Sequence, residues 1–366
     1  MNVRTKKISL IVLTCLCVWF FVQLVSCKIK TTKFPELYGF PVSSDRTSTP
    51  GVEPAAANDS IEDQPEDLAP LSVEYNGPPI HSMYEGGFEI DNPKVCGEGG
   101  SSAPELLIVV HSAASQLDMR TAVRYTWKHF DRMENVAVVF FLGRSLNGSL
   151  SERVRAESDF FGDVVVSNVV DAYENLTLKT ISMCEWARRS CPRARFVLKA
   201  DDDVFLNVPL LVDFVRQKEV SSASRSVYGM VNRGTGPVRY PGHKFDVPVE
   251  VYPGDVYPDY MQGASYLLTG DLVGPLFRAA LRMDFFRMED VFLTGFAAER
   301  IRARKVDVAR FYTLFYEMWE ERTFFEHTLR VVDPCDVKRR IAIHYVSYSD
   351  IFKLWYYLFD KTKSCR

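Results

Sequence analysis

The sequence predicts an α/β protein whose mostly parallel central sheet is covered by flanking helices on both faces. From residue 104 onward, short uninterrupted apolar runs alternate with segments of helical character. Strands that alternate with helices are typical of parallel sheets, which are buried on both faces. In addition, 47% of the 366 residues are hydrophobic, which is enough for a sizeable core.

Four apolar runs predict strands, and the segments between them predict helices. The Ser-x-x-Asp pattern of Ser115 and Asp118 is a capping-box signal for a helix that runs to about residue 130. A similar Ser-x-x-Glu pattern at Ser149 predicts the start of the next helix. The strands are expected at 105–111, 136–142, 163–167 and 195–200, and two further helices at 175–190 and 207–218.

The N-terminal region predicts a membrane anchor. Residues 8–27 form a run of 20 residues without a charge, which is long enough to span a bilayer, and basic residues flank it on both sides. We expect a cytosolic tail at 1–7, a transmembrane signal anchor at 8–27 in contact with the lipid bilayer, and the rest of the chain beyond the membrane. A cleaved signal peptide is the alternative, and residues 24–27 also resemble a bacterial lipoprotein box.

The next segment predicts a flexible stem at 28–103, because it is polar and rich in proline, serine and glutamate. It precedes a single lumenal catalytic domain at 104–366. Three N-x-[ST] sequons, at Asn58, Asn147 and Asn175, favour a glycosylated lumenal or extracellular body.

Charge and cysteine content exclude some classes of protein. The formal net charge of −3 provides no broad basic surface, so we expect no nucleic acid partner. Five cysteines follow the predicted span and its border, so at least one of them stays unpaired, and their pairing is left open. They lack C-x-x-C spacing, which argues against a zinc site. These cysteines are Cys96, Cys184, Cys191, Cys335 and Cys365.

The most informative motif is the triple carboxylate Asp201-Asp202-Asp203 at the end of a predicted strand. Three neighbouring anions repel one another unless a cation neutralises them, and oxygen ligands suit Mn²⁺ or Mg²⁺. Such an ion can stabilise a diphosphate leaving group. A solvated acidic turn is the alternative reading.

Three further features are compatible with such a site. Arg120 and Arg124 lie one helical turn apart and can hold phosphates, or form an ordinary basic face. Glu289 and Asp290 precede an apolar run, where one can act as a general base or both can simply cap a helix. His344 follows a short predicted strand and is a ligand candidate if it lies near the aspartates.

The ordered series of motifs resembles the lumenal β-1,3-galactosyltransferases and β-1,3-N-acetylglucosaminyltransferases, which are Golgi type II enzymes. The similar region is about 104–358. Its motifs are the Arg120–Trp127 segment, Phe140-Phe-Leu-Gly143, Glu157-x5-Asp163, Asp171-x-Tyr-x-Asn-Leu-Thr-Leu-Lys179-Thr180, Lys199-Ala-Asp-Asp-Asp203, Tyr257-Pro-Asp-Tyr260, Glu289-Asp290-Val291, and His344 ahead of Trp355.

The resemblance implies a glycosyltransferase-A-like fold and a UDP-sugar as donor substrate. It further implies inverting, metal-dependent transfer that forms a β1→3 linkage on a glycoprotein or glycolipid glycan. Asp203 and His344 would bind the metal, and Asp290, or less favourably Glu289, would be the base. The nucleotide-sugar would contact Arg120, Arg124, Lys179, Asp201 and Asp202, and the acceptor would contact Tyr260 and Gly263.

The resemblance leaves two donors open. UDP-galactose is favoured over UDP-GlcNAc, and an inactive membrane-anchored glycan-binding protein is the alternative of another class. This chain departs from the family at Ala264 and Ser265, where glycines are common. A phosphoryl-transfer enzyme ranks low because no G-x-x-x-x-G-K-[ST] loop is present.

Overall fold

The computed structural model describes residues 68–97, 103–133, 135–308, 334–362 and 365. The chain divides into two compact units, Met1–Asp63 and Gln64–Arg366, and all described residues belong to the second. The described residues do not include the predicted tail, the anchor at 8–27 or the sequon at Asn58. In the described part, no helix has both the length and the apolar character needed to span a bilayer.

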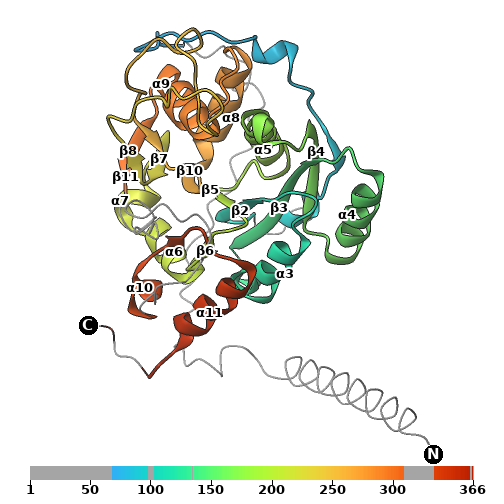
Figure 1. Ribbon diagram of the computed structural model, residues 1–366. Helices are drawn as coiled ribbons and strands as arrows, with labels where there is room; N and C mark the ends of the chain where they lie inside the picture. The colour runs from blue at the N-terminus through green and yellow to red at the C-terminus, as the bar shows by residue number, and fades with distance from the viewer. Residues whose placement is uncertain (1–67, 98–102, 134, 309–333, 363–364, 366) are drawn as a thin grey trace, which may run out of the picture. The chain divides into compact units, whose positions relative to one another are not determined.

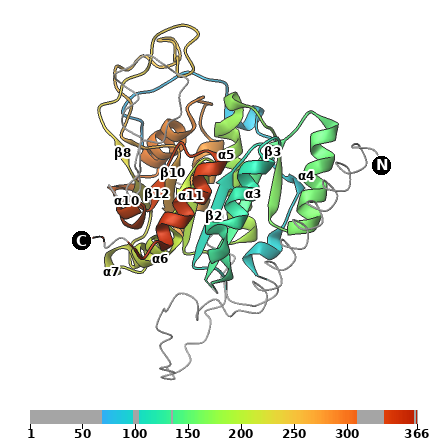
Figure 2. The same ribbon diagram turned by 60° about the horizontal axis from the view of Figure 1, so that its bottom comes forward.

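The main sheet has eight strands in the order β1-β4-β3-β2-β5-β10-β7-β11 (Figures 1 and 2). Four neighbouring strands, β4, β3, β2 and β5, pair in parallel, as predicted. However, β1 is antiparallel to β4, and β10 is antiparallel to both β5 and β7, so the sheet is mixed. The strands are β1 (Phe88–Ile90), β2 (Leu106–His111), β3 (Val136–Arg144), β4 (Val164–Val170), β5 (Phe196–Asp201), β7 (Ser226–Gly229), β10 (Ser265–Thr269) and β11 (Arg304–Asp307).

Helices cover both faces of this sheet, and alternating strand residues feed two apolar cores. On β2, for example, Leu107 and Val109 belong to the core under α5 and α8, whereas Ile108 belongs to the core under α3, α6 and α11. The α-helices are α3 (Leu117–Tyr125), α4 (Gly148–Phe161), α5 (Leu176–Ser190), α6 (Val208–Val215), α7 (Lys218–Ser221), α8 (Gly270–Leu281), α9 (Ala298–Arg300), α10 (Pro334–Arg339) and α11 (Tyr348–Phe359).

Shorter elements complete the described fold. Two small sheets pair β6 (Phe205–Leu206) with β12 (Ala342–Ile343) and β8 (Val231–Asn232) with β9 (Tyr260–Met261). The 3-10 helices are η1 (Ile80–Ser82), η2 (Pro93–Cys96), η3 (Trp127–Arg132) and η4 (Tyr173–Asn175), and η5 (Val291–Ala297) is a π-helix.

Several predicted helix ends were wrong. The capping box at Ser115 does not form, because α3 begins two residues later, after Gln116, which makes no side-chain cap. Helix α4 begins at Gly148, where Asn147 accepts hydrogen bonds from two backbone amides. The helix predicted at 207–218 is divided into α6 and α7, and Asn207 caps α6.

The predicted stem extends too far along the chain. Residues 68–97 pack on the catalytic body instead of linking it loosely: Ile80 is fully buried, and β1 is an edge strand of the main sheet. The disulfide between Cys96 and Cys191 joins this segment to the end of α5. The segment has little hydrophobic periodicity, because one short edge strand, one disulfide and a few separate buried side chains make these contacts.

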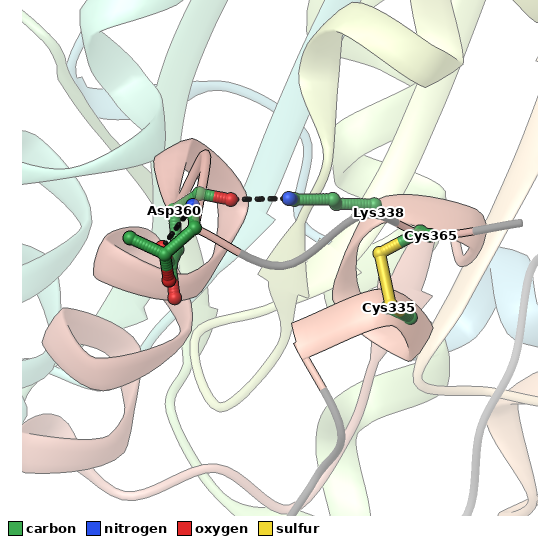
Figure 3. The surroundings of a disulfide bond; sticks show 5 residues. Cys335, Lys338, Asp360 and Cys365 are labelled. Carbon is green, nitrogen blue, oxygen red and sulfur yellow. Dashed lines mark hydrogen bonds between the residues drawn. A yellow bond between two sulfur atoms is a disulfide. The ribbon is translucent and has the colours of Figure 1, made fainter.

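A second disulfide, Cys335–Cys365, joins α10 to the chain beyond α11 (Figure 3). The Lys338 side chain of α10 donates to the carbonyl of Asp360, just after α11, and so adds to this connection. Cys184 is buried and unpaired, so the prediction of at least one unpaired cysteine is confirmed.

We expect loss of the Cys96–Cys191 bridge to destabilise the body. The two cysteines are 95 residues apart, so replacing both by alanine is expected to lower the free energy of unfolding by about 2–4 kcal/mol, measured by denaturant titration. The matched Cys335→Ala/Cys365→Ala variant removes a bridge of 30-residue separation and should lose less. An unchanged unfolding midpoint in the first variant would contradict this role.

Candidate metal and catalytic centre

The site forms where β5 ends and β12 approaches it. Asp201 is the last residue of β5, and Asp203 follows two residues later. The next strand, β6, pairs with β12 so that Phe205 lies opposite Ile343. This pairing brings His344 to the aspartates from a distant part of the chain.

Asp201, Asp203 and His344 each place one potential ligand atom in a cluster whose atoms lie within 4.8 Å of one another. His344 Nε2 is 3.3 Å from Asp203 Oδ1. The neighbouring Tyr345 has a left-handed backbone φ of 60° and stacks on the imidazole, with ring centroids 3.8 Å apart. Two carboxylates and an imidazole suit Mn²⁺ or Mg²⁺, so the structure adds Asp201 to the predicted pair Asp203 and His344.

Asp202 points to a different partner from its two neighbours. Its carboxylate accepts a hydrogen bond of 2.6 Å from the Ser112 hydroxyl, which follows β2. Burial raises the pKa of Asp202 to about 6, although the Ser112 hydrogen bond opposes this shift. Asp202 therefore belongs to the β2 side of the site.

Arg120 and Arg124 lie in the interior, where carboxylates already engage them. Arg120 Nη2 is 2.7 Å from Glu157, and its Nη1 donates to the Ser112 hydroxyl at 2.9 Å. Arg124 lies 2.7 Å from Glu157 and 2.8 Å from Asp163. The contacts of both arginines with Glu157 thus connect α3 to α4, and Arg120 also supports Ser112. The partners of these arginines were not predicted, although Glu157 and Asp163 stand in one of the motifs given above.

Lys179 on α5 is also buried and supports Ser112 as well. Its ammonium donates to the Ser112 carbonyl at 2.8 Å and to Asp171 at 2.9 Å. Ser112 thus receives hydrogen bonds from Arg120 and Lys179 and donates one to Asp202. Ser112 was not predicted as a site residue, because a single serine after a strand forms no distinctive pattern.

Lys199 is a second site residue to which the sequence alone gave no role. Its buried ammonium donates to Asp201 Oδ1 and to the Gly263 carbonyl, both at 2.6 Å, and lies 3.8 Å from Glu289 Oε2. Burial disfavours its charge, but the nearby carboxylates outweigh burial and hold the pKa of Lys199 above its usual value. The two-residue spacing on β5 places Lys199 and Asp201 on one face, a signal that was available in the sequence.

Glu289 and Asp290 occupy different environments. Glu289 is buried and accepts a 2.6 Å hydrogen bond from the Tyr266 hydroxyl, and burial raises its pKa. Asp290 is half-buried and accepts from the amide of Val291, so it also caps η5. Burial and the charge of Glu289 raise the pKa of Asp290 to about 7. A carboxyl group with this pKa suits general base chemistry near neutral pH.

The two predicted acceptor residues lie beside Asp290. A Cβ added to Gly263 would meet Asp290 Oδ2 at 3.1 Å, so a side chain at Gly263 would crowd the carboxylate. Burial, and after it the charge of Asp290, raises the pKa of Tyr260 to about 12. The Met261 amide, next to Tyr260, donates to the Thr294 hydroxyl at 2.8 Å, and Thr294 donates to the Asp290 carbonyl at 2.6 Å. The structure therefore brings the segment with Tyr260 and Gly263 to the segment with Asp290.

Two predicted glycosylation positions lie in the described part. Asn147 is exposed, and its side-chain oxygen caps α4. Asn175 is half-buried at the start of α5, and its side-chain amide donates to the Val170 carbonyl at 3.0 Å. Glycosylation of these asparagines remains a prediction.

Comparison with known proteins identifies the family. The galactosyltransferase family model matches residues 118–309, more than half of the chain. The chain is 31% identical to beta-1,3-galactosyltransferase 5 of Homo sapiens over 254 residues, which cover 69% of this chain and 77% of that protein. It is 27% identical to beta-1,3-galactosyltransferase 1 of Mus musculus over 270 residues, which cover 73% of this chain and 77% of that protein.

Among solved structures, the galactosyltransferase LgtC in complex with donor and acceptor sugar analogs matches at 10% identity, with a TM-score of 0.36, over 68% of this chain and 95% of that chain. The family assignment therefore rests on the sequence matches. By those matches, this chain belongs to the beta-1,3-galactosyltransferase family and is a glycosyltransferase enzyme.

Proposed function

We propose that this enzyme transfers galactose from UDP-galactose to an acceptor sugar on a glycoprotein or glycolipid glycan, forming a β1→3 linkage with inversion. The main support for this function is the cluster of Asp201, Asp203 and His344. Lys199 connects this cluster to the segment that bears Asp290. The names of the relatives support the sugar and the linkage. We assign the domain to a glycosyltransferase-A-like fold on the same family grounds.

Asp201, Asp203 and His344 would hold Mn²⁺ or Mg²⁺, and Asp202 would face the nucleotide-sugar. A bound divalent cation would neutralise negative charge on the diphosphate leaving group. Lys179, Arg120 and Arg124 would form the nucleotide side of the site, and all three are buried. Of these, Arg120 and Lys179 bond to Ser112 and so would keep Asp202 in place, whereas Arg124 would hold Glu157 and Asp163 behind them.

Asp290 would act as the base. Its carboxylate takes the proton from the acceptor 3-hydroxyl while the oxygen attacks C1 of galactose on the face opposite the diphosphate. The new C1–O bond forms as the C1–O bond to the diphosphate breaks, and UDP leaves with that electron pair. This single displacement inverts C1 and requires no covalent enzyme intermediate. Glu289, which accepts a hydrogen bond from the Tyr266 hydroxyl, would keep the Asp290 segment in place.

We further propose a Golgi location, with residues 8–27 as a single signal anchor and the catalytic body in the lumen. The apolar run and the three sequons support this topology. Two disulfides in the described body fit an oxidising lumen.

The donor and metal are tested by a panel of UDP-sugars with glycan acceptors and added Mn²⁺. We expect β1→3-linked galactose as the product and a loss of at least about 10²-fold in kcat/KM for Asp203→Asn, because the leaving group loses stabilisation. The matched control is Asp159→Asn, which makes the same change at an exposed residue of α4. Preference for UDP-GlcNAc would change the assigned donor, and binding of glycans without turnover would indicate a glycan-binding protein.

The pH dependence tests the base. Asp290 must be ionised to accept the proton, and its pKa is raised to about 7, so kcat/KM should fall as the pH decreases through 7. At pH 6 we expect about a tenth of the plateau value, measured with acceptor as the varied substrate. Asp290→Asn should lose about 10²- to 10⁴-fold in kcat at every pH. Normal turnover in this variant would refute the assignment.

Lys199 is the third point to test, because it connects the metal side of the site to the base side. Lys199→Met leaves Asp201 and Glu289 without their shared cation, so we expect unfolding to become easier by about 3 kcal/mol. Adding Asp201→Asn removes one uncompensated charge, so the double variant should lose less stability than the sum of the single changes. Strict additivity in denaturant titrations would show that the two side chains are not coupled.

A further inference from the structure

A hollow of about 630 Å³ lies near the proposed base and has no assigned role. Arg287, which lines it, precedes Asp290 by three residues. Tyr173 lines it as well, and the charge of Asp290, second to burial, helps to raise the pKa of Tyr173 to about 12. The hollow therefore adjoins the segment that carries Asp290, because Phe286 and Arg287 of that segment form part of its wall.

Hydrogen bonds hold the outer wall of this hollow in a defined shape. Arg287 Nη2 donates to the carbonyls of Lys244 and Asp246, at 2.8 and 2.9 Å. Arg239 donates to the Val247 carbonyl at 2.6 Å and to two further carbonyls beyond the loop. Two arginines thus fasten the loop around residues 242–248 to the body, so the wall is formed before any ligand arrives.

The lining combines apolar surface with a few polar groups. Tyr173 and Phe285 supply aromatic surface, and Lys244 lies 4.5 Å from the centre of the Tyr173 ring. Glu174 and Lys244 are exposed at the rim, with one charge of each sign. Small-molecule sites are typically pockets of about 300–1,000 Å³ with this mixture, in which apolar faces are contacted and a few polar groups orient the ligand.

We propose that this hollow binds the second sugar of the acceptor glycan, the residue to which the acceptor sugar is attached. This inference rests on the proposed transferase function and extends it. The ring of an uncharged hexose or N-acetylhexosamine would contact Tyr173 and Phe285, and its hydroxyls would bond to Glu174 and Lys244. The enzyme would therefore prefer a disaccharide acceptor to a monosaccharide with the same terminal sugar.

The test compares methyl β-glycosides of N-acetylglucosamine, N-acetylgalactosamine and galactose with disaccharides that carry the same terminal sugars. Turnover with UDP-galactose and Mn²⁺ is measured together with binding by titration calorimetry in the presence of UDP and Mn²⁺. We expect the preferred disaccharide to bind at least about 5-fold more tightly than its monosaccharide. Glu174→Ala and Lys244→Ala should each raise its KM and Kd by about 5- to 20-fold, as expected for the loss of a charged hydrogen-bonding partner.

The matched controls are Glu219→Ala and Lys218→Ala, which remove the same two charges from exposed positions on α7. KM for UDP-galactose and kcat/KM for the monosaccharide should stay within about twofold in all four variants. Equal binding of mono- and disaccharide by the native enzyme, or equal effects of the rim and control variants, would overturn the inference even if galactose is transferred. Loss of transfer with every acceptor would refute the proposed function, and the calorimetric comparison would still decide this inference.

Discussion

The ion pair between Lys199 and Asp201 is the interaction on which the rest of the site depends. Lys199 is buried, so its positive charge must be compensated inside the protein. Its partners come from three segments: Asp201 at the end of β5, Gly263 before β10 and Glu289 before η5. One ammonium group therefore places the proposed metal ligands, the acceptor turn and the segment of the base relative to one another.

A second buried network supports the opposite side of the site. Arg120 and Lys179 both bond to Ser112, which in turn bonds to Asp202. Of the three consecutive aspartates, the outer two join His344, and the middle one turns toward β2. The Ser112 hydrogen bond and the charge of Lys179 offset only part of the repulsion, because the charges of Asp203 and Asp201 still add to burial in raising the pKa of Asp202.

The sequence was a good guide where the signal was local. The runs that became β2, β3 and β5 were continuous and apolar, so their positions were predictable. The antiparallel direction of β10 in the sheet was not predictable, because it depends on the path of the segment before it. His344 was recognised as a candidate, but its approach to Asp203 depends on the pairing of β6 with β12. The partners of Arg120 were missed, since helical spacing describes a face and not what covers it.

The packing of residues 68–97 has a consequence for any soluble fragment of this enzyme. A fragment that starts at residue 104 lacks β1, so β4 would become an open edge of the sheet, which favours association between molecules. It would also carry Cys191 as a free thiol without its bonding partner. Recombinant catalytic fragments should therefore begin before Leu68, and be made in a compartment that oxidises thiols.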